Sequence, residues 1–226
     1  MKRILFASII VALSVLVIGE STGLSRPQLA AAELPASVNG GKTLYPVADA
    51  WVNFNGKDIK YGTDIRLKVG SEECPGQEFP DRGRALIKFD LSAIPAGVVI
   101  ESASLQLYLS SAYAGGAATN TISVHRVAGS WVETDVTWNN QPGHSATSYA
   151  ATDVGLSSSK WYTWDITGLV REWYNGVYSN YGLKLVSAAE TTCNMRYFDS
   201  RENLYDPRLV ITYSASYYLP LLVKSP

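Results

Sequence analysis

From Thr43 onward, hydrophobic and polar residues alternate in short runs separated by clusters of Gly, Pro, Asn and Ser. The alternation is clearest in residues 100–110, where positions 103, 105, 107 and 109 are apolar and positions 104, 106 and 108 carry polar groups. A period of two is typical of an antiparallel strand with one buried and one solvated face. Repeated short runs of this kind predict a sandwich or barrel of antiparallel strands.

The pattern predicts eleven strands and one short helix. The strands are 44–47, 50–54, 66–69, 84–90, 100–110, 121–127, 136–138, 161–166, 182–187, 195–199 and 208–213. The helix begins after Thr167 as its N-cap and ends at Asn175-Gly176. Its apolar stripe consists of Leu169, Val170 and Trp173, and we expect it to close one end of the sandwich.

Five of the six tryptophans lie in residues 131–182, next to Thr, Asn and Asp. A buried Trp contributes a large apolar surface, but its ring N–H requires a hydrogen-bond acceptor. The segment therefore predicts a β core with polar groups at its corners.

The first residues are typical of an export signal. Lys2 and Arg3 precede an apolar run of 15 residues over positions 4–18, which is shorter than the roughly 20 needed to span a bilayer. A removed signal is therefore favoured over an uncleaved anchor. Cleavage is expected within residues 1–32, at Ala30-Ala31-Ala32 rather than near Gly19 and Ser21, so that the protein is secreted and extracellular or associated with the cell surface.

The remaining chain divides into three predicted parts: a spacer over 33–42, one domain over 43–213 and an apolar tail over 214–226. About 190 residues after the signal suffice for one domain with a full core. The apolar stretch 217–223 in the tail is too short to cross a bilayer. It is interpreted as packed against the domain, with a sorting tail as the alternative.

Charge and cysteine content narrow the function. The 19 basic and 20 acidic residues give a net charge of −1, which does not favour a nucleic-acid partner. Cys74 and Cys193 are the two cysteines, and in an oxidising compartment they predict one disulfide. A zinc site is a poor alternative because neither His residue and no second Cys pair lies nearby.

No recognised catalytic motif is present. The chain lacks a Gly-x-Ser-x-Gly elbow, a His-Glu-x-x-His pair, a phosphate-binding glycine loop and a short-range Cys–His pair. We therefore expect a protein that is not an enzyme and has no cofactor. The candidates for a structural calcium ion are Asp49, Asp64 and Asp81 in the early loops, although their spacing matches no EF-hand.

Strand alternation suggests a binding surface made of residues that point away from the core. The predicted contact strip consists of Arg84, Lys88, Gln106, Tyr108, His125 and Lys184. If these residues share one sheet, they form a basic and aromatic strip. Arg pairs bidentately with carboxylates and Tyr stacks on sugar rings, so an acidic polysaccharide is the expected ligand. The alternative is a merely solvated sheet face.

Several motifs follow one another in a recognisable order. They include Asp49-Ala50-Trp51-Val52, Tyr61-Gly62, the run from Arg84 to Leu91, the run from Trp131 to Asn139, Asn180-Tyr181-Gly182-Leu183, Ser200-Arg201-Glu202 and Pro207-Arg208-Leu209. Together they resemble the DNRLRE domain, a family that overlaps with carbohydrate-binding module family 96. The resemblance implies a jelly-roll-like β-sandwich in a secreted or surface protein, and binding of acidic polysaccharides such as alginate.

The expected function is that of a secreted, non-catalytic carbohydrate-binding module. The first alternative is a structural component of the cell envelope or extracellular matrix without sugar affinity, and the second is a polysaccharide lyase or glycosidase. The expected partners are a polysaccharide and, as alternatives, a separate secreted enzyme or a cell-envelope protein. We expect no nucleic acid and no membrane span after signal removal.

Overall fold

The computed structural model describes residues 36–76, 78, 80–113 and 117–217. This part of the chain contains β1 (Ala36–Leu44), β2 (Pro46–Asn53), β3 (Arg66–Ser71), β4 (Arg82–Phe89), β5 (Val99–Ala112), β6 (Asn120–Arg126), β7 (Ala150–Val154), β8 (Lys160–Asp165), α1 (Thr167–Tyr174), β9 (Leu183–Ser187), β10 (Arg196–Asp199) and β11 (Arg208–Tyr217). The expected all-β architecture with one short helix is confirmed.

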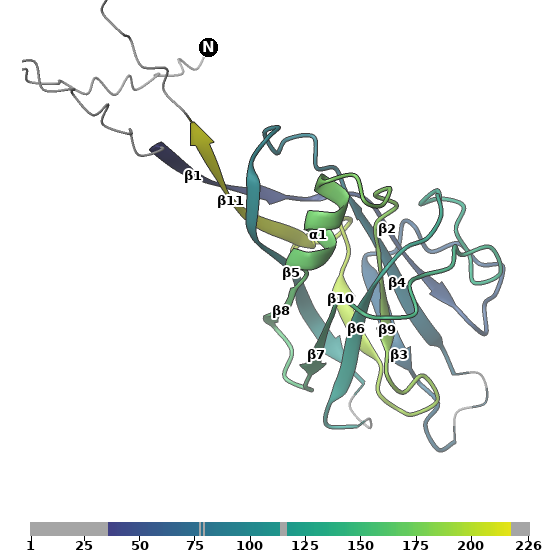
Figure 1. The fold of residues 1–226 in the computed structure, drawn as a ribbon. Helices are drawn as coiled ribbons and strands as arrows, with labels where there is room; N and C mark the ends of the chain where they lie inside the picture. Colours follow the sequence, from purple (N-terminus) through teal and green to yellow (C-terminus); the bar gives the residue numbers. More distant parts are fainter. Residues whose placement is uncertain (1–35, 77, 79, 114–116, 218–226) are drawn as a thin grey trace, which may run out of the picture. The chain divides into compact units, whose positions relative to one another are not determined.

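The strands form a curled antiparallel sheet whose two halves face each other (Figure 1). Strands β1, β11, β5, β10 and β8 make up one half, here called sheet A. Strands β2, β4, β9, β6 and β7 make up the other half, sheet B. Strand β3 pairs with β10 and with β4, so it joins the two sheets at one edge. This is the jelly-roll-like sandwich that the sequence predicted.

The main core lies between the two sheets. Leu105 and Leu107 of β5 pack there with Trp164 of β8 and Ile87 of β4, all almost fully buried. Helix α1 adds Leu169, Val170 and Trp173 to the same cluster. Burial of large apolar side chains contributes about 1.5–3 kcal/mol each relative to exposure, which makes this cluster the principal stabilising element.

The start of α1 differs by one residue from the prediction. Ile166 occupies the N-cap and Thr167 is the first helical residue. The Thr167 hydroxyl instead accepts the Ala103 N–H at 2.9 Å and donates to Asp165 Oδ1 at 2.5 Å, so it links the helix to β5. The predicted end is confirmed, since Asn175 is the C-cap and Gly176 follows with a φ of 70°, which favours glycine.

Strand pairing decides where the domain begins and ends. Residues 36–44, which include most of the predicted spacer, form β1 and pair with β11 along its whole length. β11 in turn continues to Tyr217, inside the predicted tail. The strand character of residues 36–42 was not predicted, because small residues and glycines carry no alternation although their backbones pair as well as any others. Residues 1–32 and 218–226, on which the signal and most of the tail were predicted, lie outside the described residues.

Two further predictions of strands need correction. Residues 136–138 are not a strand, because they belong to the long segment between β6 and β7. Strand β7 was missed, since its sequence AATDV has small and polar residues and lies at an edge of sheet B. Strand β7 pairs with β6 through backbone hydrogen bonds, which the pattern of side chains does not reveal.

The predicted disulfide is confirmed. Cys74, between β3 and β4, is bonded to Cys193, which lies just before β10, with their Cα atoms 4.7 Å apart. The two residues are 119 positions apart in sequence. In the chain-entropy model, closing so long a loop contributes about 3 to 5 kcal/mol.

The tryptophan N–H groups find their partners far along the chain. Trp131 donates to the Tyr181 carbonyl and Trp164 to the Ile122 carbonyl, each at 2.8 Å, and Trp51 donates to Asp64 Oδ2 at 2.9 Å. The buried N–H of Trp173 has no partner among the described residues. The expected β core is present, but in two of these three cases the acceptor is a backbone carbonyl distant in sequence and not a neighbouring polar side chain.

Candidate functional site

The six residues of the predicted contact strip do not share one sheet. Gln106 and Tyr108 lie on β5 in sheet A, whereas Arg84, Lys88, His125 and Lys184 lie on strands β4, β6 and β9 of sheet B. All six point away from the main core, as the alternation predicted. The condition for a single strip is therefore not met, because alternation assigns a face to each strand but does not say which sheet the strand joins.

The outer face of sheet B is covered by the segment 127–149, which connects β6 to β7. A second small core forms there. It contains Ala50, Val52, Leu86, Val127 and Val136, with Trp131, Trp138 and Tyr181 packed against it. Most of the sheet B part of the predicted strip therefore faces protein.

Lys184 and Arg84 have structural partners beneath this cover. Lys184 is only 1% exposed, and its Nζ donates to Gln141 Oε1 at 2.9 Å and to the Pro142 carbonyl at 2.6 Å. Burial, reinforced by the nearby Arg84 guanidinium, lowers the pKa of Lys184 to about 8. Arg84 is itself held by Glu190 through two hydrogen bonds of 2.6 Å.

His125 is also held in place, since its two ring nitrogens are 2.8 Å from the Ser145 carbonyl and 3.0 Å from Ser123 Oγ. Its ring lies edge-on to His144, whose pKa burial lowers to about 4, with Lys184 as the next cause. Of the four sheet B residues, Lys88 alone makes no side-chain hydrogen bond or ion pair within the described residues.

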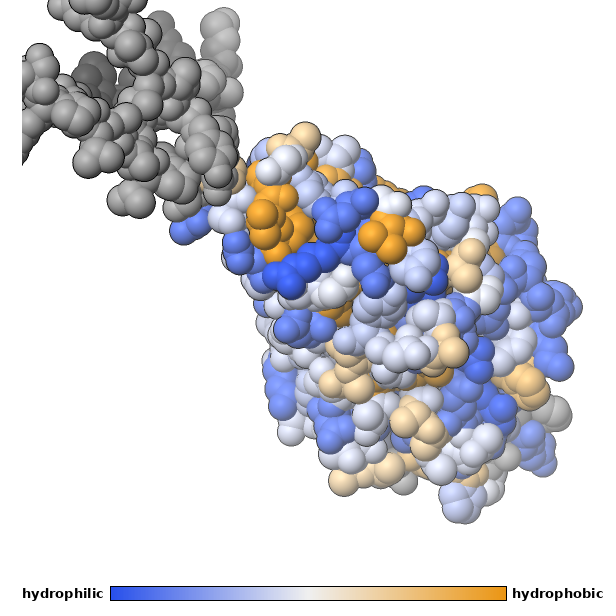
Figure 2. Space-filling model, in the orientation of Figure 1, coloured by the Kyte–Doolittle hydropathy of each residue, from blue (hydrophilic) through white to orange (hydrophobic). Residues whose placement is uncertain are grey.

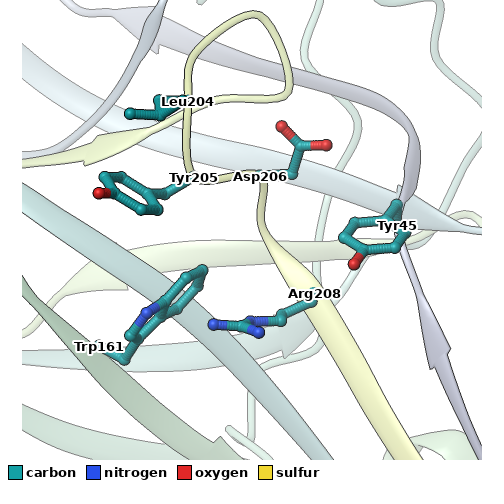
Figure 3. A pocket seen from close by; sticks show the side chains of 6 residues that line it. All are labelled: Tyr45, Trp161, Leu204, Tyr205, Asp206 and Arg208. Atoms are coloured by element: carbon teal, nitrogen blue, oxygen red, sulfur yellow. The ribbon is translucent and has the colours of Figure 1, made fainter.

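The outer face of sheet A carries an aromatic groove. Its lining residues come from the β1–β2 junction, from β8, from the β10–β11 loop and from the start of β11. They are Tyr45, Trp161, Leu204, Tyr205, Asp206 and Arg208, and they enclose about 380 Å³ (Figure 3). Tyr45 is 57% exposed and Leu204 is 77% exposed, so the groove is open to solvent.

Arg208 lies at the floor of this aromatic groove. Its guanidinium carbon is 3.6 Å from the centroid of the Trp161 ring, and Figure 3 shows the guanidinium beside the indole. Within the described residues its side chain donates no hydrogen bond and pairs with no carboxylate, and its buried Nε lacks an acceptor. A planar cation with free donors beside an aromatic face is suited to bind a carboxylate or sugar hydroxyls.

Two residues of the predicted strip adjoin the groove. Tyr108 packs against Tyr205 with ring centroids 4.0 Å apart and meets Trp161 edge-on at 5.5 Å. Gln106 is the direct cross-strand neighbour of Arg208. Their part in ligand binding stays a prediction, but the structure places both next to the groove.

Neither Trp161 nor Arg208 was predicted as a site residue, although the sequence contains a signal for each. In β8 the buried residues are Tyr162 and Trp164, so alternation already puts Trp161 on the outer face. In β11 the buried residues Leu209 and Ile211 do the same for Arg208. The registers Tyr108 opposite Trp161 and Gln106 opposite Arg208, which bring the four side chains together, are visible only in the folded sheet.

The three aspartates considered for calcium do not gather. Asp64 accepts hydrogen bonds from the Trp51 indole and the Arg66 N–H, and Asp81 pairs with Lys68 at 2.7 Å. Both are therefore structural acceptors. Asp49 lies elsewhere, beside Glu133 and Glu202.

The face of the molecule shown in Figure 2 is largely hydrophilic, with small separate hydrophobic spots. No helix among the described residues is long and apolar enough to cross a membrane. The open aromatic groove with its unpaired guanidinium has the geometry of a candidate ligand site, and a β-domain that presents one belongs to the class of candidate binding domains.

The comparison with known families agrees with this class. The model of carbohydrate-binding module family 96 matches residues 41–213, and the chain belongs to that family. The match spans both sheets, the disulfide and the aromatic groove. The comparison with curated proteins finds no match.

Proposed function

We propose that the protein is a secreted, non-catalytic module that binds a carboxylate-bearing polysaccharide in the aromatic groove of sheet A. The observation that carries this proposal is Arg208, which stacks on Trp161 and keeps its hydrogen-bond donors free. A uronate residue offers both a flat face for the aromatic rings and a carboxylate for the guanidinium.

Each part of the groove has a role in this proposal. Trp161 and Tyr205 supply rings that are apolar on the face and polar at one edge, which suits a sugar ring. Arg208 pairs with the uronate carboxylate, and Asp206 accepts hydrogen bonds from sugar hydroxyls. Because the groove is open, the ligand is the interior of a polymer chain as readily as its end.

The lining of the groove also supports a role in binding without catalysis. Most glycosidases use two carboxyl groups on opposite sides of the scissile bond. Among the described residues that line the groove, Asp206 is the one carboxylate. Secretion is supported by the apolar run near the N-terminus and by the Cys74–Cys193 disulfide, a bond typical of oxidising compartments.

Affinity electrophoresis tests the proposal. The protein is run through gels containing alginate or a neutral glucan, at low and high salt. We expect retardation by alginate that weakens as salt rises, because the Arg208 contact is partly electrostatic. Arg208→Ala and Trp161→Ala are each expected to abolish it.

The matched control is Arg126→Ala. Arg126 also stacks on an aromatic ring, Tyr178, with its guanidinium carbon 3.7 Å from the ring centroid, but it lies at the end of β6 in sheet B. This variant should be retarded like the wild type. Absence of retardation by any polymer would favour the structural role in the cell envelope or matrix, and equal retardation of Arg208→Ala and the wild type would place the ligand elsewhere.

A further inference from the structure

Three carboxylates from distant parts of the chain meet beside β2. Asp49 belongs to β2, Glu133 to the segment that covers sheet B, and Glu202 to the β10–β11 loop. One carboxylate oxygen of each lies within 4.8 Å of the other two. Like charges at this separation repel each other unless a cation or a proton compensates them.

Asp49 provides an independent indication of a missing partner. It is 1% exposed, and its Oδ1 is buried with no hydrogen-bond partner, while its Oδ2 accepts the Arg201 backbone N–H at 2.9 Å. A buried carboxylate oxygen without a partner is strongly unfavourable, so a cation ligand would satisfy Asp49 Oδ1.

Arg201 compensates only part of the charge. Its guanidinium nitrogens lie 3.4 Å from Glu133 and 3.3 Å from Glu202, and one of them donates to the Val47 carbonyl at 2.7 Å. Asp49 has no ion pair among the described residues. Three carboxylates against one guanidinium leave a local excess of negative charge.

We propose that Asp49, Glu133 and Glu202 bind one calcium ion. Calcium accepts six to eight oxygen ligands in a flexible arrangement, so three carboxylates and water can complete its shell. Magnesium requires a stricter octahedron, and the absence of thiol and imidazole groups from the trio disfavours zinc and copper. The set differs from Asp49, Asp64 and Asp81, with only Asp49 in common.

The ion would also position the groove. Glu202 stands at the start of the loop that carries Leu204, Tyr205 and Asp206, and Asp49 and Glu133 belong to β2 and to the cover of sheet B. Calcium would therefore fasten this loop to two other parts of the domain. This inference goes beyond the proposed function and does not require it to be correct.

Thermal unfolding of the full chain tests the site without any polysaccharide. The protein is treated with EDTA, dialysed, and heated with calcium chloride, with magnesium chloride or with neither. We expect calcium at about 100-fold over its Kd to raise Tm by about 5–10 °C, and magnesium to raise it less. Calorimetric titration should show one calcium ion per chain.

Two variants and one control assign the ligands. Glu202→Gln, at the surface, should fold normally and bind calcium at least about 10-fold more weakly. Asp49→Asn should lose the calcium-dependent rise in Tm. The control Asp153→Asn removes an exposed carboxylate of β7 that accepts a hydrogen bond from Thr121, and it should respond to calcium as the wild type does.

Several outcomes would overturn the proposal. The first is that calcium leaves the Tm of the wild type unchanged and that Asp49→Asn is as stable as the wild type. The Asp49 carboxyl is then simply protonated. The second is that Glu202→Gln binds calcium as tightly as the control Asp153→Asn does. A larger response to magnesium would overturn the choice of ion. If Asp49→Asn fails to fold, Glu202→Gln decides.

Discussion

The outer faces of sheets A and B have the same pattern of alternating residues in the sequence, but they lie in different environments in the folded protein. On sheet A, Tyr108 and its neighbour Trp161 border an open groove that also contains Arg208. On sheet B, Leu86 and Lys184 are buried beneath the segment 127–149. On both sheets, residues of the outer face alternate along the strand with residues of the main core. Only the outer face of sheet A is open to solvent at its centre.

This difference shows that a side chain pointing away from the main core is not by itself evidence for a binding site. A Lys or Arg that points away from one core can still be buried by another part of the chain. Lys184, which donates to Gln141 and Pro142, illustrates this. By contrast, the Arg208 side chain makes no hydrogen bond or ion pair within the part of the chain that the structure describes. Unsatisfied donors on an open face are therefore stronger evidence for a ligand than positive charge alone.

The largest expected effect lies in the second core. Leu86→Ala should lower the free energy of unfolding by about 2–5 kcal/mol, because Leu86 is 0% exposed and its removal leaves a cavity. Polysaccharide affinity of the folded fraction should not change. Urea denaturation measures the first quantity and affinity electrophoresis the second.

Val132→Ala is the control, since Val132 belongs to the same covering segment but is 61% exposed. It should change stability by no more than about 0.5 kcal/mol. Loss of affinity in Leu86→Ala at temperatures where it is folded would contradict the separation of the two faces.

The next effect concerns the buried ammonium of Lys184. Because the pKa of Lys184 is about 8 in the folded protein and about 10.4 when unfolded, the unfolded chain binds more protons between these values. The free energy of unfolding therefore rises with pH between about 8 and about 10.4. Below this window the buried ammonium of Lys184 lowers the free energy of unfolding by about 3 kcal/mol. Lys184→Met should remove this rise, as measured by urea denaturation at pH 7.5, 9 and 10.

The charged and titratable groups around Lys184 are Arg84, Glu190, His144 and the cross-strand neighbour His125. Burial lowers the pKa of His144 to about 4, so this imidazole is already neutral throughout the window. Lys88→Met, at a half-buried position on the same face, should preserve the rise. Parallel pH profiles of the wild type and Lys184→Met would show that Lys184 does not titrate in this range.

A smaller free-energy change is expected on the open face. Tyr108→Ala should weaken alginate binding by about 10-fold, or about 1.4 kcal/mol, because Tyr108 supports the Tyr205 ring at the groove. Its effect on unfolding should be about 1 kcal/mol. Titration calorimetry gives the affinity. Tyr178→Ala, an exposed tyrosine outside the groove, should bind as the wild type does, and equal affinities of all three proteins would remove Tyr108 from the site.

The smallest effect on binding is expected from Arg84→Ala combined with Lys88→Ala. The affinity for alginate should stay within about twofold of the wild type, because both residues lie on sheet B. Stability should fall by about 1 kcal/mol with the loss of the half-buried Arg84–Glu190 pair. Affinity electrophoresis of the double variant checks the expected affinity. A complete loss of retardation would make the predicted contact strip the binding surface again.

Much of the fold could be predicted from the sequence, and the errors share a cause. Strands with clear alternation, such as β5, and the helix with its Asn175-Gly176 stop were recognised because their side chains are sorted by burial. Strands β1 and β7 were missed because small and polar residues leave no such pattern. The candidate site was predicted only in part, since Tyr108 and Gln106 adjoin the groove whereas Trp161 and Arg208 were not singled out.

The sequence by itself determined which residues turn toward the main core, which cysteines pair, and to which family the chain belongs. These properties follow from local periodicity, composition and the order of short motifs. Only the tertiary structure decided that Tyr108 meets Trp161, that Gln106 lies opposite Arg208, and that residues 127–149 cover sheet B. The reason is physical: register and loop packing arise from contacts between residues far apart in the chain, and a period of two carries no information about the neighbouring strand.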